Sequence, residues 1–359
     1  MNEKKLSLGV ILGDGVGHDV LPVVTEVMKE AALADKVQVD PTVYNYGALR
    51  YLEEGSPLPE DVPALVHDLA NKHDAILFGS AGLDPRIPPD VNCRDLLRAL
   101  RLELDLYVNL RPAFLFDPSF SPLRKEVPID LTVMRENTEG VMVRLGGNFK
   151  KGTKDEVAIQ EDVNTYKGVE RICRYAFEYA KKHNYPKVTM ADKFGSLVHA
   201  HDLWQRVFWQ INDEFPEVEG EHYFIDTLCM DLIQHPEEFS VIVTNNMYGD
   251  ILSDVCAGLV GGVGMAPSGC IHPGKVSMFE PVHGTAPDIA LKGIANPFAT
   301  TLTARILLST LGYDASADII LSAVKNAIRE KSVTGDLGGN LKTKEVGDVL
   351  CKFIQKFYE

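Results

Sequence analysis

Short apolar runs alternate along the chain with longer segments in which apolar residues recur every three or four positions. Runs of four or five mostly apolar residues are typical of buried strands, whereas the wider spacing is typical of helices with one buried face. This alternation favours an α/β fold with much parallel sheet. The predicted strands are Leu8–Leu12, Ala75–Phe78, Leu131–Met134, Val188–Ala191 and Val241–Thr244, and the clearest helices are Asp19–Ala32 and Asp95–Leu104.

One segment, Gly146–Thr165, departs from this alternation. It contains glycines and paired lysines, followed by the alternating polar and apolar residues of Glu156–Gln160. Such a pattern predicts a hairpin or arm that projects from the body, and exposed strands of this kind often pair with another chain. Because no low-complexity linker or internal repeat divides the chain, we expect interleaved domains rather than domains in series.

Length and composition set broad limits on function. A chain of 359 residues is long enough for two domains and a large core, and 45% apolar with 24% charged residues is ordinary for a soluble globular protein. The formal net charge of −15 argues against binding to nucleic acid or an anionic membrane surface. It does not exclude an anionic substrate, because a local arginine cluster overrides the global sign.

The cysteines and the N-terminus indicate a cytoplasmic protein. The six cysteines are scattered and form no CxxC pair, so neither a zinc ribbon nor a disulfide framework is predicted. The first apolar run is too short for a signal peptide, and no run reaches the length that spans a membrane.

Two carboxylates follow the predicted strand Val241–Thr244. If Gly249 ends the strand and a helix begins there, Asp250 and Asp254 share one helix face, one turn apart. A hard divalent cation such as Mg²⁺ or Mn²⁺ takes oxygen ligands and would relieve their repulsion. The alternative is a solvated helix start, where aspartates favour the positive end of the helix dipole.

A glycine-rich turn, Gly13–Gly17, lies between the first strand and the first helix, as a dinucleotide-binding loop would. The Rossmann pattern requires a third glycine at position 18, where this chain has His18. A tight strand-to-helix turn is therefore at least as good an interpretation.

Seven segments carry a further pattern through their order and spacing. They are Gly13–Gly17, Leu97–Pro112, Arg135–Gly140, Asp192–Lys193, Ile225–Asp226, Gly249–Asp254 and Phe279–Ala290. Together they resemble the β-decarboxylating dehydrogenases, the family of isocitrate, 3-isopropylmalate, homoisocitrate and tartrate dehydrogenases, and most closely the isopropylmalate branch. The resemblance implies a two-domain isopropylmalate-dehydrogenase-like fold. Residues 1–106 plus 261–359 would form the cofactor-binding domain, and 107–260 the substrate and dimerisation domain with an arm at 141–165.

The same resemblance implies an activity and its site. The expected reaction is NAD-dependent oxidative decarboxylation of a malate-type 2-hydroxy acid, with Mg²⁺ or Mn²⁺. The first candidate substrate is 3-isopropylmalate, an intermediate of leucine biosynthesis, and the alternatives are isocitrate, homoisocitrate or tartrate-like acids. Lys193 would accept the hydroxyl proton, and Asp226 would be both catalytic and the third metal carboxylate. Both would come from the neighbouring subunit of a homodimer with shared active sites.

Three arginines, Arg101, Arg111 and Arg135, stand where the family binds the carboxylates of malate. A guanidinium group stays charged and binds a carboxylate through two parallel hydrogen bonds. Near the first of them, Leu97 suits an apolar group on the substrate. Arg98 instead suits a polar or anionic group, unless it points to solvent.

The segment after Phe279 resembles the family's adenosine-binding loop. A carboxylate there accepts hydrogen bonds from the ribose hydroxyls of NAD and repels the extra phosphate of NADP, so NAD is the predicted cofactor. The predicted cofactor-binding residues are Glu280, His283, Gly284, Ala286, Asp288 and Asn296.

Two positions depart from the family pattern. Met142 stands where the family usually has the tyrosine that returns a proton to the product, and Gly195 replaces a usual asparagine. A thioether has no acidic proton. Three explanations compete: another donor such as water or Tyr166, a different substrate, or a catalytically impaired paralogue or regulatory subunit. Because every predicted metal and carboxylate ligand is kept, a working enzyme is the favoured interpretation.

Overall fold

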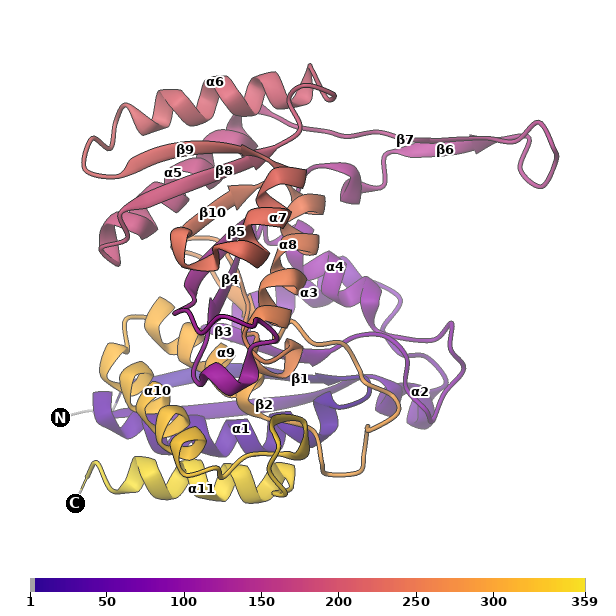
Figure 1. The fold of residues 1–359 in the computed structure, drawn as a ribbon. Helices are drawn as coiled ribbons and strands as arrows, with labels where there is room; N and C mark the ends of the chain where they lie inside the picture. Colours follow the sequence, from indigo (N-terminus) through magenta and orange to yellow (C-terminus); the bar gives the residue numbers. More distant parts are fainter. Residues whose placement is uncertain (1–3, 359) are drawn as a thin grey trace. The chain divides into compact units, whose positions relative to one another are not determined.

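The computed structural model describes residues 4–358 and confirms the predicted α/β class (Figure 1). The chain divides into two compact units, which are described separately. The first unit comprises 1–106, 115–124 and 257–359, and the second comprises 107–114 and 125–256. None of the described helices is both long and apolar enough to cross a membrane.

The first unit contains five strands in the order β2-β1-β3-β12-β11. Strand β1 lies parallel to both β2 and β3, β3 lies parallel to β12, and β11 is antiparallel to β12. Every residue of β3 is buried, as its apolar sequence predicts. The strand bounds are β1 Lys4–Gly13, β2 Val37–Gly47, β3 Ala75–Ser80, β11 Gly269–Ile271 and β12 Ser277–Phe279.

The helices of this unit come from both ends of the chain. Helix α1 packs against the late helices α9, α10 and α11, and α3 packs against α4 (Figure 1). Helix α3 begins where the Asp61 carboxylate accepts the Ala64 N–H, with a proline in its first turn. The bounds are α1 Gly17–Ala32, α2 Ala48–Glu54, α3 Val62–Lys72, α4 Arg94–Glu103, α9 Phe298–Thr310, α10 Asp314–Arg329 and α11 Thr343–Gln355.

The second unit contains five strands in the order β4-β5-β10-β8-β9. Strands β4 and β5 are antiparallel, and β5, β10, β8 and β9 are parallel neighbours. The carboxyl ends of the parallel strands therefore lie at one edge. The bounds are β4 Val108–Phe114, β5 Asp130–Glu136, β8 Lys187–Asp192, β9 Glu219–Phe224 and β10 Val241–Thr244.

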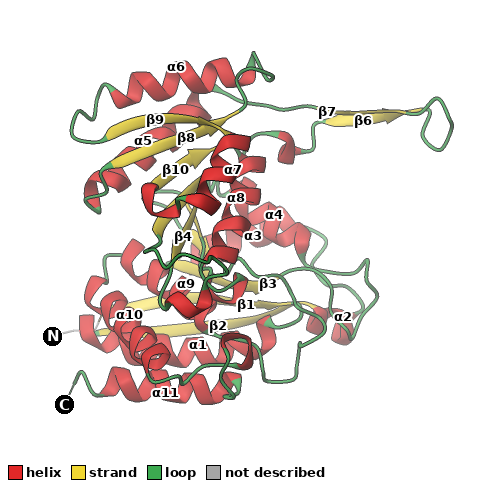
Figure 2. Cartoon of the chain, viewed as in Figure 1, coloured by secondary structure: helices red, strands yellow, loops and turns green. Residues whose placement is uncertain are grey.

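Four helices accompany these strands, and α5 packs against α6 (Figure 2). Helix α5 begins at Thr165, whose hydroxyl accepts the Gly168 N–H. The bounds are α5 Tyr166–Lys182, α6 Ala200–Asn212, α7 Ile225–Gln234 and α8 Asn246–Leu259, of which the last three residues fall in the first unit.

The segment that broke the alternation forms a projecting hairpin (Figure 1). Strands β6 (Gly146–Phe149) and β7 (Val157–Gln160) pair antiparallel with each other in a separate two-stranded sheet. All eight strand residues are exposed, including Phe149 and Ile159. A two-stranded hairpin with exposed apolar side chains is marginally stable by itself, which favours cover by a further chain.

Candidate active site

The aspartate pair lies on helix α8, but the helix does not begin where the sequence suggested. It starts at Asn246, so the prediction that Gly249 ends the strand and opens the helix is wrong. The Asn245 side chain accepts the Tyr248 N–H at 2.9 Å and supplies the local reason for the earlier start. Asp250 and Asp254 still lie one turn apart on the helix, as predicted.

Two buried arginines converge on Asp250. The Nη1 of Arg111, on β4, lies 3.3 Å from the Asp250 carboxylate and 2.5 Å from the Ser253 hydroxyl. Arg135, on β5, also pairs with Asp250 and donates from Nε and Nη2 to the Asn246 side chain at 3.0 and 2.7 Å. The Arg111 Nε is buried and lacks a hydrogen-bond partner within the described chain. An orphaned guanidinium N–H of this kind fits an anion that the protein itself does not supply.

Asp254 completes the chemistry of this cluster. Its carboxylate has no hydrogen bond or ion pair within residues 4–358. Partial removal of water raises the pKa of Asp254, and the neighbouring Asp250 acts in the same direction while Arg111 and Arg135 oppose it. The negative charge of Asp254 is therefore unfavourable in the free protein, and a bound cation would stabilise it. Mg²⁺ and Mn²⁺ prefer oxygen ligands, and the adjacent carboxylates of Asp254 and Asp250 provide them.

Lys193 and Asp226 form a second cluster in the same unit. Lys193 follows the end of β8 and Asp226 lies in the first turn of α7, and their Nζ and Oδ1 atoms are 2.6 Å apart. The hydrogen bond from Lys193 lowers the pKa of the Asp226 carboxyl. Within the described part of a single chain, no three His, Cys, Asp or Glu side chains are grouped to hold a metal. The addition of Asp226 to the other two aspartates by a second chain remains a prediction.

In the first unit, Arg101 is held by a predicted cofactor residue. Its Nη2 lies 2.6 Å from Glu280, although the two residues are 179 positions apart. The Arg101 Nε is buried without a partner in the described chain, as for Arg111. Leu97 is partly buried on the same helix. Arg98 is exposed and lies 3.7 Å from Asp95, so in the single chain it faces solvent.

The loop after Glu280 is built onto the glycine-rich turn near the N-terminus. The Val16 N–H donates to the Thr285 carbonyl at 2.9 Å, and a Cβ on Gly15 would lie 2.2 Å from that oxygen. The turn's other amides are also used internally: those of Asp14 and Gly15 donate to Ser80 and Asp84. These donors are therefore not free to cradle a phosphate, and the tight-turn interpretation fits better.

The remaining predicted cofactor-binding residues differ in how exposed they are and in how many of their hydrogen-bonding atoms are already used. Burial lowers the pKa of His283, so its ring is neutral, and its Nδ1 lies 3.0 Å from the Gly284 carbonyl. Asp288 is exposed, and Ala286 adopts a positive φ of 38° in the turn before it. Asn296 is buried, and its side chain already donates to Asp336 and accepts the Phe298 N–H. Asn296 therefore has one amide hydrogen at most to offer a cofactor.

The two departures from the family pattern lie in open places. Met142 is 42% exposed in the short 3-10 helix Val141–Val143, at the root of the hairpin. A Cβ on Gly195 would meet no atom within 4 Å. The hydroxyl of Tyr166, the other candidate proton donor, donates to Gln210 at 3.0 Å.

Two buried aspartates lie in segments that the sequence analysis singled out, but the sequence assigned no role to either of them. The Asp14 carboxylate accepts the backbone N–H groups of Ala48, Gly82 and Cys93. Asp192 is 1% exposed and accepts hydrogen bonds from His222, Gln205 and the Phe194 N–H. The available signal was their place directly after predicted strands, where polar residues gather at functional edges.

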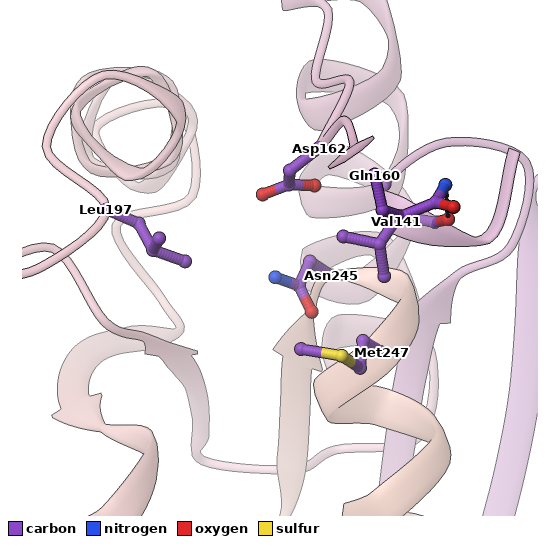
Figure 3. A pocket seen from close by; sticks show the side chains of 7 residues that line it. Val141, Gln160, Asp162, Leu197, Asn245 and Met247 are labelled. Carbon is purple, nitrogen blue, oxygen red and sulfur yellow. Dashed lines mark hydrogen bonds between the residues drawn. The ribbon is translucent and has the colours of Figure 1, made fainter. Parts of the chain in front are cut away.

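A cavity of about 240 Å³ lies at the root of the hairpin (Figure 3). Asp162 and Leu197 face each other across it, and Asn245 and Met247 form the side nearest the start of α8. None of the residues that line it is a predicted site residue.

Comparison with known proteins places the chain in one class of enzyme, the decarboxylating dehydrogenases. A family model described as isocitrate/isopropylmalate dehydrogenase matches residues 7–350. The chain therefore belongs to the isocitrate/isopropylmalate dehydrogenase family, as its motifs predicted, and it acts as a malate-type dehydrogenase.

The individual matches extend over nearly the whole chain. It is 41% identical to 3-isopropylmalate dehydrogenase of Thermobifida fusca over 358 residues, which cover 99% of each protein. It is 44% identical to the enzyme of the same name from Corynebacterium jeikeium over 347 residues, covering 96% of this chain and 98% of the relative.

Two solved structures share the fold. Isocitrate dehydrogenase from Methylococcus capsulatus matches with a TM-score of 0.85 at 32% identity, over 98% of this chain and 99% of that chain. A protein from Thermus thermophilus, known as TT0538, matches with a TM-score of 0.86 at 33% identity, over 99% of this chain and 69% of that chain.

Proposed function

We propose that the protein catalyses the NAD-dependent oxidative decarboxylation of 3-isopropylmalate, with Mg²⁺ or Mn²⁺ as a cofactor. The observation that carries this proposal is the cluster on α8. Asp250 lies between two buried arginines, one of which has an orphaned Nε, and Asp254 is free one turn further on. The arginines can bind the carboxylates of an anionic substrate, and the aspartates can bind a cation that the same substrate chelates. A cluster with both kinds of side chain therefore fits a chelated anion. The two relatives described above both carry the name 3-isopropylmalate dehydrogenase.

The arginines orient the substrate in this mechanism. Arg111, Arg135 and Arg101 are the guanidinium groups that we propose for its carboxylates, because each can bind a carboxylate through two parallel hydrogen bonds. Asp250, Asp254 and the Asp226 of a second chain would hold the cation, which would supply Lewis acidity for the loss of CO₂, and bound NAD⁺ would supply the hydride acceptor. Lys193, as the neutral amine, would take the proton of the C2 hydroxyl at its Nζ, an atom that in the free chain donates to Asp226 at 2.6 Å.

The final proton transfer is the step for which the chain is least equipped. Met142 has no proton to donate, and the Tyr166 hydroxyl already donates to Gln210. We therefore propose that water returns the proton to carbon. Loss of one positioned general acid slows a reaction by about two to four powers of ten without abolishing it.

NAD is the proposed cofactor because the exposed Asp288 carboxylate would accept hydrogen bonds from two ribose hydroxyls and repel a 2′-phosphate. The first unit, which carries this loop, would be the cofactor-binding domain. Glu280 would act through Arg101, which it already holds.

A homodimer with shared active sites is the proposed assembly. The hairpin exposes Leu145, Phe149 and Ile159 with no cover from the described chain, and its two strands leave their outer edges unpaired. The metal carboxylates are also divided between two clusters within one chain. A second copy that brings Lys193 and Asp226 to the other chain's Asp250 would complete the set.

Complementation tests this assembly. An Asp250→Asn chain and a Lys193→Ala chain should each be inactive alone. When they are unfolded together and refolded, mixed dimers should regain one intact site, which amounts to about a quarter of wild-type activity for random pairing in a two-fold dimer. No recovery, with dimers present by sedimentation, would place the whole site within one chain.

A second candidate substrate class is favoured by Arg98. Its guanidinium is exposed and lies 3.7 Å from the Asp95 carboxylate, and Arg98 precedes the partly buried Arg101 by one helix turn. A polar or anionic γ-substituent, as in isocitrate, homoisocitrate or tartrate-like acids, would gain a charged partner there.

A substrate screen tests the proposed function directly. NADH formation would be followed with 3-isopropylmalate, isocitrate, homoisocitrate and tartrate, with and without EDTA, and with NADP⁺ as the control cofactor. We expect turnover of 3-isopropylmalate with NAD⁺ that EDTA abolishes and added Mn²⁺ restores. No turnover of any acid at high enzyme concentration would favour a non-catalytic paralogue. Full activity in EDTA would remove the metal from the mechanism.

A further inference from the structure

The backbone of Lys193 is fixed by contacts that the reaction itself does not require. The Lys193 carbonyl accepts the N–H groups of Ser196 and Leu197, both at 2.9 Å, which closes a tight turn. The next amide, that of Phe194, donates to the buried Asp192 carboxylate at 3.0 Å. The Lys193 N–H itself donates to the Nδ1 of His201 at 2.6 Å. The side chain of Lys193 therefore extends from a backbone held on every polar atom.

His201 is suited to this contact because of where it lies. It is the second residue of α6, it is fully buried, and its own N–H donates to the Leu197 carbonyl at 2.9 Å. Its ring lies edge-on to Tyr248 with centroids 5.8 Å apart. The second ring nitrogen, Nε2, lies 3.3 Å from the amide nitrogen Nδ2 of Asn245, a residue that lines the cavity at the root of the hairpin (Figure 3).

The hydrogen bond from Lys193 fixes the tautomer of His201. A backbone N–H only donates, so Nδ1 must present a lone pair and the hydrogen must reside on Nε2. The Nε2–H then faces the amide nitrogen of Asn245, so the 3.3 Å approach between those two atoms is a contact and not a hydrogen bond. Burial lowers the pKa of His201, with opposite contributions from the Asp192 and Asp162 carboxylates, so the ring is neutral. A proton on Nδ1 would place two donors face to face and break the contact with Lys193.

We propose that His201 is a positioning residue, whose Nδ1 holds the backbone of Lys193 so that the lysine Nζ reaches the substrate hydroxyl. This inference rests on the proposed role of Lys193 as proton acceptor. His201 touches neither substrate nor cofactor in this role. A displacement of about 1 Å at a reacting group lowers the rate by up to about 100-fold. The loss of the hydrogen bond that anchors the Lys193 backbone should therefore lower the rate measurably.

Two substitutions separate positioning from packing. In His201→Asn the Oδ1 atom occupies the place of Nδ1 and can accept the same N–H, but the loss of ring atoms leaves a void. In His201→Gln the polar atoms extend towards the place of Nε2, and more of the buried volume is kept. A packing role predicts that activity follows stability, so that the glutamine variant is the better enzyme. A positioning role predicts the reverse.

The test measures kcat, KM and thermal stability of both variants in the full-length enzyme with its metal. We expect His201→Asn to keep kcat within about threefold, and His201→Gln to lose about 10- to 100-fold in kcat with little change in KM. The pH profile of His201→Asn should lack any acidic limb that arises from protonation of His201. Equal losses in both variants, or losses that follow their melting temperatures, would overturn the proposal.

A readout without turnover keeps this test independent of the proposed reaction. With ¹⁵N-lysine labelling, the Lys193 amide signal is identified by its loss in Lys193→Arg. Its position should be preserved in His201→Asn and move upfield in His201→Gln, because a short hydrogen bond deshields the amide proton. An unchanged Lys193 signal in His201→Gln would refute the anchor itself. If the wild type turns over none of the acids but the signal moves as expected, the anchor stands and the proposed function fails.

Discussion

Gly249 offers the sharpest test of how α8 is fitted to the substrate arginines. It lies inside the helix, three residues after its start, with no unusual backbone angle. A Cβ placed there would lie 2.5 Å from the Arg135 Cβ and 2.7 Å from its Cγ. Ordinary carbon contacts begin at about 3.4 Å, so Gly249→Ala requires Arg135 or the helix to move by nearly an ångström. Arg135 is 4% exposed and tied to Asn246 and Asp250, so it has little freedom to move.

The expected cost follows from packing and hydrogen bonding. Overpacking of a buried contact destabilises a protein by about 1–3 kcal/mol. A charged hydrogen bond contributes about 1.5–3 kcal/mol, so misplacing one guanidinium contact to substrate should lower kcat/KM by about 10- to 150-fold. Alanine is also a better helix former than glycine by up to about 1 kcal/mol, which opposes the loss.

Gly258 supplies a matched control in the same helix. It is exposed, and a Cβ there would meet no atom within 4 Å. Gly258→Ala should therefore show the helix-propensity gain alone, and the difference in unfolding free energy between the two alanine variants should be the cost of the close approach. Urea unfolding and initial rates over a range of substrate concentrations measure both quantities. If the two variants match in stability and in kcat/KM, the close fit between α8 and β5 is wrong.

Four further substitutions test other parts of the structure. Met142→Tyr should raise kcat by about tenfold or more on an accepted acid, because a phenol restores a proton donor at an exposed position; an unchanged rate would show that the surroundings have adapted to methionine. Gly195→Asn should change the unfolding free energy by less than about 0.5 kcal/mol, since its Cβ meets open space; a large loss would place this loop in a tighter environment. Arg98→Leu should leave turnover of 3-isopropylmalate intact and reduce any turnover of acids with a charged γ-group, whereas equal rates and no activity on such acids would remove Arg98 from specificity. Burial raises the pKa of Glu136 to about 7 from 4.5, so its stabilising effect is complete below pH 4.5 and is lost as pH rises through about 7. Glu136→Gln should therefore gain on the wild type by up to about 3 kcal/mol between pH 5 and pH 8 in unfolding experiments, and a constant difference across that range would contradict the buried, proton-binding carboxyl.

Local pattern was a reliable guide wherever a segment's own residues decided its structure. The apolar run Val241–Thr244 is a strand with the same bounds in the structure, and the alternating Glu156–Gln160 lies in an exposed hairpin. The spacing of side chains along a strand or helix is set by backbone geometry, which is the same in every protein. The periodicity of apolar residues therefore predicts such segments from the sequence. The motif alone did not decide the role of the glycine-rich turn Gly13–Gly17. The hydrogen bonds of its backbone amides did, and a sequence pattern does not show where those amides point.

The start of α8 shows where local pattern failed. Glycine is a poor helix former, so the sequence pattern predicts the boundary between strand and helix at Gly249. The helix instead begins at Asn246, because Asn245 caps it and because the absence of a side chain at Gly249 lets the helix approach Arg135. The glycine is there for packing between elements, and that reason is invisible along the chain.

The sequence by itself determined the α/β class, the projecting hairpin, the family and the residue types of the site. Tertiary structure alone decided their partners: Glu280 with Arg101, Asp250 between two arginines, and His201 beneath Lys193. These pairs join residues that are mostly far apart in the chain, and no periodicity specifies them. Their geometry is fixed only when strands and helices pack, because the free energy of a buried charge or hydrogen bond depends on what the fold places beside it.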